Sequence, residues 1–192
     1  MNIVSAKFLI SCEKYFQTQE YDLSEIAFLG RSNVGKSSLI NALANHKGLA
    51  KSSSTPGKTQ LINFFEVTFA DKKQLILIDL PGFGYARVSK DKKAAWNKNL
   101  NEFLQKRKEI KCFIHLIDSR HDNLDIDEGV FDYLQDFMSE EQVYIKVFTK
   151  IDKLNQSEFS KLKAKYKDAI FVSSSNKKGI DKLQAKLYEY IK

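Results

Sequence analysis

The sequence is short of cysteine, proline and long hydrophobic runs, and each shortage excludes a class of protein. Its two cysteines, Cys12 and Cys112, lie far apart, and neither belongs to a CxxC pair or a Cys/His cluster. This pattern argues against a structural zinc site and fits a reducing compartment. No apolar run approaches the roughly 18 residues that span a bilayer, and the N-terminus lacks a charged segment followed by a cleavage site. We therefore expect a cytoplasmic protein with no membrane span.

Internal repeats and low-complexity linkers are also lacking. The 192 residues fit one domain of ordinary size, and 43% hydrophobic residues are enough for a packed core. We expect residues 1–192 to form a single domain that acts as a monomer.

Positive charge is in excess, with 31 Lys and Arg against 24 Asp and Glu. The net charge of +7 favours polyanionic partners through encounter and non-specific affinity. Most of it is lysine, which meets phosphate as a point charge without the fork that arginine uses to read bases. Two interpretations stay open: an RNA-facing patch, and a lysine-rich surface that only keeps the protein soluble. We expect no DNA partner.

Apolar runs typical of strands alternate with stretches of helical period, which is the pattern of an α/β fold. The expected strands are residues 25–30, 61–69, 74–79, 112–118, 143–149 and 169–173. Most are continuous apolar runs, as expected of strands covered on both faces. Helical stretches are expected at residues 38–44, around Phe131, Leu134 and Met138, and along Ile180, Leu183, Leu187 and Ile191. We predict a mostly parallel six-stranded sheet flanked by helices.

The strongest motif is GRSNVGKS at residues 30–37, a complete GxxxxGK[ST] between an apolar strand and a helical stretch. In that context the backbone N–H groups of the loop and the helix N-terminus cradle phosphate. Lys36 is expected to reach the β- and γ-phosphates, and the Ser37 hydroxyl to bind Mg²⁺. A chance glycine-rich turn is the alternative. The predicted phosphate-binding residues are Gly30, Arg31, Ser32, Asn33, Val34, Gly35, Lys36, Ser37 and Ser38.

A second motif, LILIDLPG at residues 75–82, delivers a carboxylate to the end of an apolar strand. In a parallel sheet Asp79 lies beside the phosphate loop, where it can hold Mg²⁺ through a coordinated water. Gly82 can bring its N–H close to the γ-phosphate, and the predicted nucleotide site includes Leu80 and Pro81. A strand end followed by a Pro-Gly turn is the alternative.

The base is predicted by TKIDK at residues 149–153, which follows another apolar strand. Guanine offers two adjacent donors, N1–H and the 2-amino group, and the Asp152 carboxylate can accept both. Adenine would leave that carboxylate unpaired, which costs about 1 to 3 kcal/mol. The Lys150 stem can cover the base plane, and a helix-capping aspartate is the alternative. The predicted base-binding residues are Thr149, Lys150, Asp152 and Lys153.

Three serines, Ser173, Ser174 and Ser175, follow the last expected strand. Their backbone N–H groups can meet the guanine O6 and close the site. A serine turn without a ligand explains the same composition.

Together these segments resemble the ordered guanine-nucleotide motifs of the EngB family of small GTPases, also called YihA or YsxC. The matching segments are GRSNVGKSS, TPGKTQ (55–60), DLPGFGYA (79–86), TKIDK and SSS. The resemblance runs from about residue 21 to the end of the chain. It implies a Ras-like P-loop GTPase three-layer fold, a GTP/GDP switch cycle with Mg²⁺, and a role in assembling the large ribosomal subunit in bacteria. The implied partners are GTP, GDP and the large subunit or its rRNA.

The resemblance also implies roles for single residues. Thr59, with Gly57 and Lys58 beside it, takes the place of the switch threonine that closes over Mg²⁺ and the γ-phosphate; Thr55 is the local competitor. Asn33 lies where potassium-activated relatives place an asparagine oxygen against K⁺, and a loop-capping asparagine is the alternative. The resulting catalytic set is Lys36, Thr59 and Gly82, and the metal set is Ser37, Thr59 and Asp79.

Two histidine-containing features have no catalytic role in this interpretation. Arg120 and His121 match a family dipeptide to which no mechanism is attached. His115, inside the apolar run 112–118, is interpreted as a core histidine with its hydrogen bonds satisfied, rather than as a metal ligand.

Two departures from the broader GTPase pattern bear on activity. Thr149 replaces the commoner asparagine of NKxD, so we expect a looser contact between base and phosphate loop and a moderate affinity. Phe83 stands where Ras-type enzymes use a glutamine to orient the attacking water, so unaided hydrolysis is expected near ~10⁻⁴ s⁻¹. The expected reaction is in-line attack of water on the γ-phosphate. Lys36, Mg²⁺ and loop N–H groups stabilise the charge.

The γ-phosphate is expected to hold the segments near residues 45–60 and 80–93 and to release them when it is lost. These segments carry a basic surface: Lys47, Lys51, Lys58, Arg87, Lys90, Lys92 and Lys93. Three other functions stay open: an ATP-dependent phosphotransferase of nucleoside-kinase type, a non-catalytic module with GTP as a structural ligand, and a membrane-associated signalling GTPase. The last is weakened by the lack of a CaaX box or an N-terminal Met-Gly.

Overall fold

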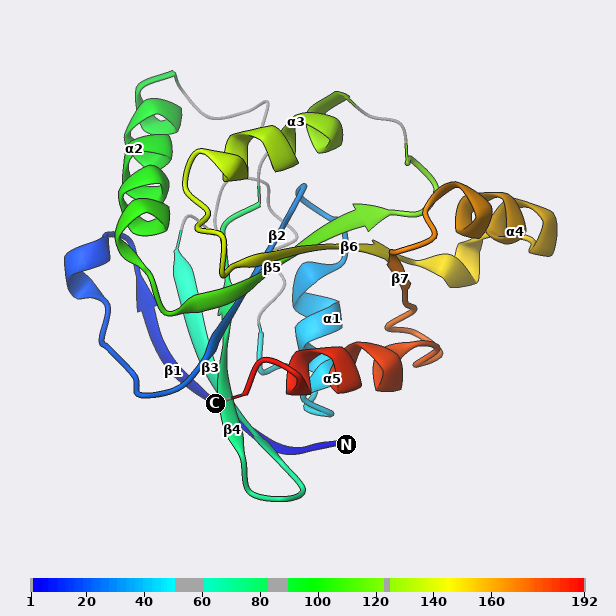
Figure 1. Cartoon of the computed structure of the whole chain (residues 1–192), viewed down its shortest axis with the longest axis horizontal. Helices are drawn as coiled ribbons and strands as arrows, with labels where there is room; N and C mark the ends of the chain where they lie inside the picture. The colour runs from blue at the N-terminus through cyan, green and yellow to red at the C-terminus, as the bar shows by residue number, and fades with distance from the viewer. Residues whose placement is uncertain (1, 51–60, 83–89, 123–124, 192) are drawn as a thin grey trace.

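Among the residues that the structure describes, seven strands form a single sheet (Figure 1). The computed structural model describes residues 2–50, 61–82, 90–122 and 125–191, with the backbone alone for residues 90–97 and 125–126. The strand order is β1-β3-β4-β2-β5-β6-β7. The strands are β1 (Ile3–Cys12), β2 (Glu25–Gly30), β3 (Ile62–Phe69), β4 (Gln74–Asp79), β5 (Ile110–Asp118), β6 (Val143–Thr149) and β7 (Ile170–Phe171).

The pairing confirms the mostly parallel α/β sheet and corrects the number of strands. β1 pairs antiparallel with β3, and β3 antiparallel with β4, while the other four pairs are parallel. The prediction of six strands was wrong because β1 was missed. Val4 and Phe8 of this edge strand are exposed, although Ile3 and Cys12 are buried. A half-exposed edge strand lacks the continuous apolar run by which the other strands were recognised.

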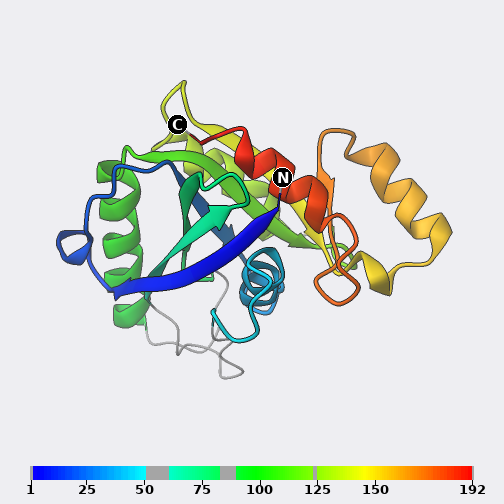
Figure 2. The same cartoon turned by 90° about the horizontal axis from the view of Figure 1, so that it is seen from below.

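Helices cover both faces of the sheet (Figures 1 and 2). α1 (Lys36–Leu43) and α5 (Ile180–Tyr188) share one core with Ile26 and Phe28 of β2. On the opposite face, α2 (Lys90–Lys106) and α3 (Asp125–Gln135) share a second core with Ala27 and Leu29. All six residues of β2 are buried because a central strand is covered on both sides.

The last strands form the outer end of the sheet. There α4 (Gln156–Lys165) inserts Leu162 against Phe148 of β6 (Figure 1). Two single turns of 3-10 helix, Tyr15–Gln17 and Ile151–Lys153, complete the described elements. α2 and α4 were not predicted, because both are rich in lysine and present few apolar residues. Of the predicted helical positions, Met138 and Ile191 lie beyond the ends of α3 and α5.

The topology brings the sequence motifs to one edge. β2, β4, β5 and β6 are parallel neighbours, so their carboxyl ends lie together. The phosphate loop follows β2, and Asp79, Asp118 and Thr149 end the other three strands. In the part of the chain that the structure describes, no helix is both long and apolar enough to cross a membrane.

Candidate nucleotide-binding site

The phosphate loop between β2 and α1 is shaped by two glycines. Gly35 is the N-cap of α1 and has a φ of 103°, which glycine adopts without strain. A Cβ on Gly30 would lie only 2.8 Å from the carbonyl oxygen of Leu116, so no larger residue fits there. Because Gly35 has no side chain with which to cap the helix, the first N–H groups of α1 can serve an anion.

Lys36 and Asp79, predicted to serve phosphate and Mg²⁺, lie in direct contact. The Lys36 ammonium donates a hydrogen bond to the Asp79 carboxylate. Asp79 is only 3% exposed, so the ammonium supplies the partner that a buried carboxylate requires. A phosphate group entering the loop would compete with Asp79 for this lysine.

The segment after β4 runs alongside the phosphate loop. A Cβ on Gly82 would lie 3.2 Å from the backbone nitrogen of Ser32 and 3.4 Å from the carbonyl oxygen of Gly30. The N–H of Leu80 donates to the Phe28 carbonyl at 3.0 Å, which ties the start of this segment to β2. The close approach brings the Gly82 backbone against the phosphate loop, and the contact of its N–H with a γ-phosphate stays a prediction.

The donors near the loop fit a magnesium ion that is bound together with a nucleotide. Ser37 and Asp79 offer a hydroxyl and a carboxylate, the hard oxygen ligands that Mg²⁺ prefers. Among the described residues, no group of three or more His, Cys, Asp or Glu could hold a metal by itself. Two protein oxygens suffice only when phosphate oxygens and water complete the shell.

Several predicted residues cannot be placed. Gly57, Lys58, Thr59, Thr55 and Phe83 lie outside the described residues, as do Lys51 and Arg87 and the side chains of Lys90, Lys92 and Lys93. The role of Thr59 as third Mg²⁺ ligand therefore stays a prediction. So does the role of Phe83, which stands where Ras-type enzymes have a glutamine.

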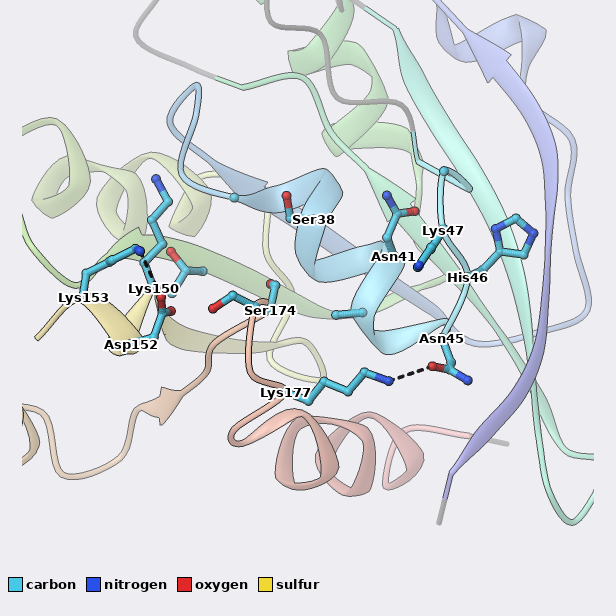
Figure 3. A pocket seen from close by; sticks show the side chains of 15 residues that line it. Ser38, Asn41, Asn45, His46, Lys47, Lys150, Asp152, Lys153, Ser174 and Lys177 are labelled. Carbon is cyan, nitrogen blue, oxygen red and sulfur yellow. Dashed lines mark hydrogen bonds and ion pairs between the residues drawn. The ribbon is translucent and has the colours of Figure 1, made fainter.

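A cavity of about 680 Å³ opens beside the phosphate loop, between α1 and the loops that follow β6 and β7 (Figure 3). Its predicted lining residues are Gly35, Ser38, Thr149, Lys150, Asp152, Lys153, Ser174 and Ser175. The other lining residues were not among the predicted nucleotide-binding residues, although residues 45–48 belong to the predicted switch segment 45–60: Asn41, Ala42, Asn45, His46, Lys47, Gly48 and Lys177. Asn45 and Gly48 have positive φ values, as residues of turns often do.

Asp152 lies in the 3-10 turn after β6 and lines this cavity. Its Oδ1 accepts a hydrogen bond from the Ser173 hydroxyl at 2.6 Å. Its Oδ2 lies 3.6 Å from Lys153 Nζ (Figure 3). The hydrogen bond from Ser173 is the main reason that the pKa of Asp152 is lowered. The carboxylate is therefore ionised at neutral pH and can accept two donors.

The three serines after β7 have different roles. Ser173 is fully buried, and its N–H donates to the Lys178 carbonyl at 2.9 Å. The prediction that this N–H meets the base was wrong, because the group is engaged inside the protein. The Ser173 hydroxyl instead orients Asp152. Ser174 and Ser175 line the cavity, as a contact with the base requires.

Thr149 and Lys150 connect β6 to the phosphate loop. The Thr149 hydroxyl donates to the Val34 carbonyl at 2.6 Å, which links β6 to the phosphate loop. The looser contact expected between the base and this loop stays a prediction. Lys150 Nζ donates to the Asn33 carbonyl at 2.6 Å. A Cβ on Gly35 would lie 3.7 Å from Lys150 Cε, so the stem of this lysine crosses the loop.

Two further side chains point into the protein. Arg31 Nε lies 2.9 Å from Asp127 Oδ2, so the Arg31 side chain reaches the start of α3. His115 is buried, and its Nδ1 lies 2.6 Å from the Tyr144 hydroxyl. Burial lowers the pKa of His115 and favours the neutral ring. The prediction of a core histidine is confirmed.

Comparison with known proteins identifies the family. A family model described as "50S ribosome-binding GTPase" matches residues 25–150. A probable GTP-binding protein EngB from Campylobacter lari is 63% identical over 188 residues, which cover 96% of this chain and 94% of that protein.

Solved structures agree on the fold. A probable GTP-binding protein engB superposes with a TM-score of 0.64 at 23% identity, over 87% of this chain and 98% of that chain. Era in complex with MgGDPNP and nucleotides 1506–1542 of 16S ribosomal RNA gives a TM-score of 0.64 at 21% identity, over 88% and 57% of the two chains. The protein therefore belongs to the EngB family of GTP-binding proteins, which are GTPases with a Ras-like P-loop fold.

Proposed function

We propose that this protein is a guanine-nucleotide switch that hydrolyses GTP slowly and acts as a cytoplasmic monomer in the assembly of the large ribosomal subunit. The observation that carries the nucleotide part is Asp152, an ionised carboxylate that lines the cavity beside the phosphate loop. The ribosomal part is supported by the family, described as 50S ribosome-binding, and by the net charge of +7. The phosphotransferase alternative loses support because the family is one of GTPases.

In this proposal the base and the phosphates are bound by different chemistry. Asp152 accepts the N1–H and 2-amino groups of guanine, and the Lys150 stem covers the base plane. The loop N–H groups and Lys36 bind the β- and γ-phosphates. Ser37 and Asp79, with Thr59, hold Mg²⁺, which neutralises charge on the phosphate oxygens when it is bound. Asn33 is the proposed contact for K⁺.

The contact between Lys36 and Asp79 gives the switch a chemical basis. Lys36 is bound to the Asp79 carboxylate, which competes with the phosphates, and Asp79 ends the strand that leads into the segment 80–93. When the phosphates take the lysine, Asp79 becomes free to act toward the magnesium ion. Nucleotide state is thereby transmitted to the segment after β4.

A base swap tests the nucleotide site. Asp152→Asn exchanges an acceptor for a donor, so the variant should lose guanine nucleotides by roughly 100-fold and gain xanthine nucleotides, which carry an oxygen at position 2. Asp181→Asn on α5, an exposed aspartate outside the cavity lining, is the matched control and should bind GDP as the wild type does. An Asp152→Asn protein that keeps its preference for guanine would remove Asp152 from this role.

Cosedimentation with ribosomal subunits tests the cellular role. We expect the protein to bind large subunits more tightly with a non-hydrolysable GTP analogue than with GDP. Depletion of the protein should make large-subunit precursors accumulate in subunit profiles. Equal binding in both nucleotide states, or normal profiles after depletion, would contradict the switch and the assembly role respectively.

A further inference from the structure

Asp118 escaped the sequence analysis, yet its carboxylate contacts the lysine proposed to cover the base. Asp118 ends β5, directly opposite Thr149 in the register with β6. Its Oδ2 accepts a hydrogen bond from Lys150 Nζ at 2.9 Å. Because the same ammonium donates to the Asn33 carbonyl at 2.6 Å, Lys150 is held at two points, one on the sheet and one on the phosphate loop.

Arg120 fixes the same carboxylate from the other side. Its Nε donates to Asp118 Oδ1 at 2.9 Å, and its Nη2 donates to Oδ2 at 2.7 Å. The Arg120 backbone N–H donates the third hydrogen bond to this carboxylate, to Oδ1 at 3.1 Å. A guanidinium fork of this kind fixes the plane of a carboxylate as well as its charge. This contact gives a function to Arg120, for which the sequence indicates no mechanism.

The Asp118 carboxylate is buried and carries a charge. Asp118 is 5% exposed, while the Arg120 side chain is 44% exposed and covers it from outside. Burial alone would raise the pKa of Asp118, but hydrogen bonds from Arg120 and Lys150 outweigh it and hold the pKa well below its ordinary range. Asp118 is therefore ionised at neutral pH.

We propose that Asp118 is a positioning residue for guanine-nucleotide binding, which fixes the Lys150 side chain across the phosphate loop and is itself fixed by Arg120. The inference rests on the proposed nucleotide site and extends it. A lysine side chain has many rotamers, so fixing it costs conformational entropy. That entropy is lost either when the protein folds or when the nucleotide binds. The contact with Asp118 moves that loss to folding, so nucleotide binding does not have to order Lys150.

Dissociation of a fluorescent GDP tests the proposal. Asp118→Asn should release GDP about tenfold faster, because the ion pair with Lys150 is replaced by a hydrogen bond to an uncharged acceptor. Arg120→Ala should accelerate release by a smaller factor, about threefold, and Arg120→Lys should recover only part of it, since lysine lacks the fork. The guanine preference over adenine should change much less than the release rate, because Asp152 is untouched.

A double-mutant cycle separates positioning from a merely structural role. If Asp118 acts through Lys150, Asp118→Asn combined with Lys150→Met should release GDP no faster than Lys150→Met alone. Additive effects would overturn the proposal. Arg120→Ala enters the same cycle if Asp118→Asn does not fold, since the Arg120 side chain is 44% exposed. Lys186→Ala, which removes an ion pair on α5, is the control and should release GDP at the wild-type rate.

The outcomes distinguish this inference from the proposed function. A wild-type protein that binds no guanine nucleotide would contradict the proposed function itself. Tight binding by the wild type together with unchanged release from both Asp118→Asn and Arg120→Ala would overturn the positioning role and leave the proposed function standing.

Discussion

The two halves of the proposed nucleotide site differ in how far their charged groups are already in place. In the base half, Ser173 holds Asp152, and Asn33 and Asp118 hold Lys150. Guanine can enter without breaking these bonds, because an ionised carboxylate has about four acceptor sites and Ser173 occupies one. In the phosphate half, Lys36 is bound to Asp79 and must exchange that partner for phosphate.

This difference matches two different tasks. The same base must be recognised in both the GTP-bound and the GDP-bound state. This favours side chains that are already ordered in the folded protein, because nucleotide binding then costs little conformational entropy. Sensing whether a phosphate is present needs contacts that exist in one state and are replaced in the other. The comparison predicts that substitutions in the phosphate half disturb both stability and hydrolysis, whereas substitutions in the base half act mainly on affinity.

Lys36→Ala should have the largest effect. GTP hydrolysis should fall by at least roughly 100-fold, because the main charge opposite the transferring phosphate is lost. The nucleotide-free protein should also lose about 1 to 3 kcal/mol in its free energy of unfolding, since the buried Asp79 is left unpaired. Single-turnover assays and chemical denaturation measure the two effects.

The double variant Lys36→Ala/Asp79→Asn is the control for this prediction. Removing the carboxylate charge should restore much of the stability without restoring hydrolysis. A Lys36→Ala protein as stable as the wild type would show that the contact between these two residues is absent in solution.

Ser173→Ala should have an intermediate effect, confined to the base half. Without the hydroxyl, Asp152 loses its orientation, and GDP affinity should fall about tenfold. Ser160→Ala, an exposed serine on α4, is the matched control and should bind as the wild type does. Unchanged calorimetric affinity in Ser173→Ala would mean that Asp152 does not depend on this bond.

The same variant should shift the pH dependence of binding. The Ser173 hydrogen bond lowers the pKa of Asp152 from its ordinary 3.8, so the wild-type carboxylate remains ionised until the pH falls below that value. In Ser173→Ala the pKa rises, and loss of GDP on acidification should begin at a higher pH. Because the pKa of Asp152 is lower in the folded protein than in the unfolded chain, the ionised carboxylate stabilises the fold above the unfolded pKa. This stabilisation is lost as the pH falls through the folded pKa. Superimposable pH profiles of the two proteins would contradict this prediction.

Thr149→Val should have the smallest effect. The substitution keeps the shape of the side chain but removes the donor to the Val34 carbonyl. We expect GDP to dissociate about threefold to fivefold faster, in line with a net hydrogen-bond contribution near 1 kcal/mol. Thr149→Ser should restore the wild-type rate, and equal rates in all three proteins would indicate that this link has no role in binding.

Much of the proposed site was predictable because its chemistry is local in sequence. The phosphate loop follows an apolar strand, Asp79 and Thr149 end two others, and parallel pairing then brings the ends of those strands together. These motifs carry their own backbone requirements, as Gly30 and Gly35 illustrate. The single-domain prediction, by contrast, remains a prediction.

The missed parts depend on directions of side chains that a sequence does not state. Asp118 is one of several aspartates after apolar runs, and only the register with β6 places it against Lys150. The sequence does not distinguish Ser173 from its two neighbours, whereas in the fold its N–H donates to the Lys178 carbonyl. β1 was missed because an edge strand with one exposed face has a weak hydrophobic signal.

Calorimetric titration of the nucleotide-free protein tests the central claim most directly. Binding of GDP that strengthens with Mg²⁺, with ADP at least roughly 100-fold weaker, is the result that a preordered base site beside a phosphate loop predicts. Comparable binding of GDP and ADP, or no binding of either by folded protein, would contradict it.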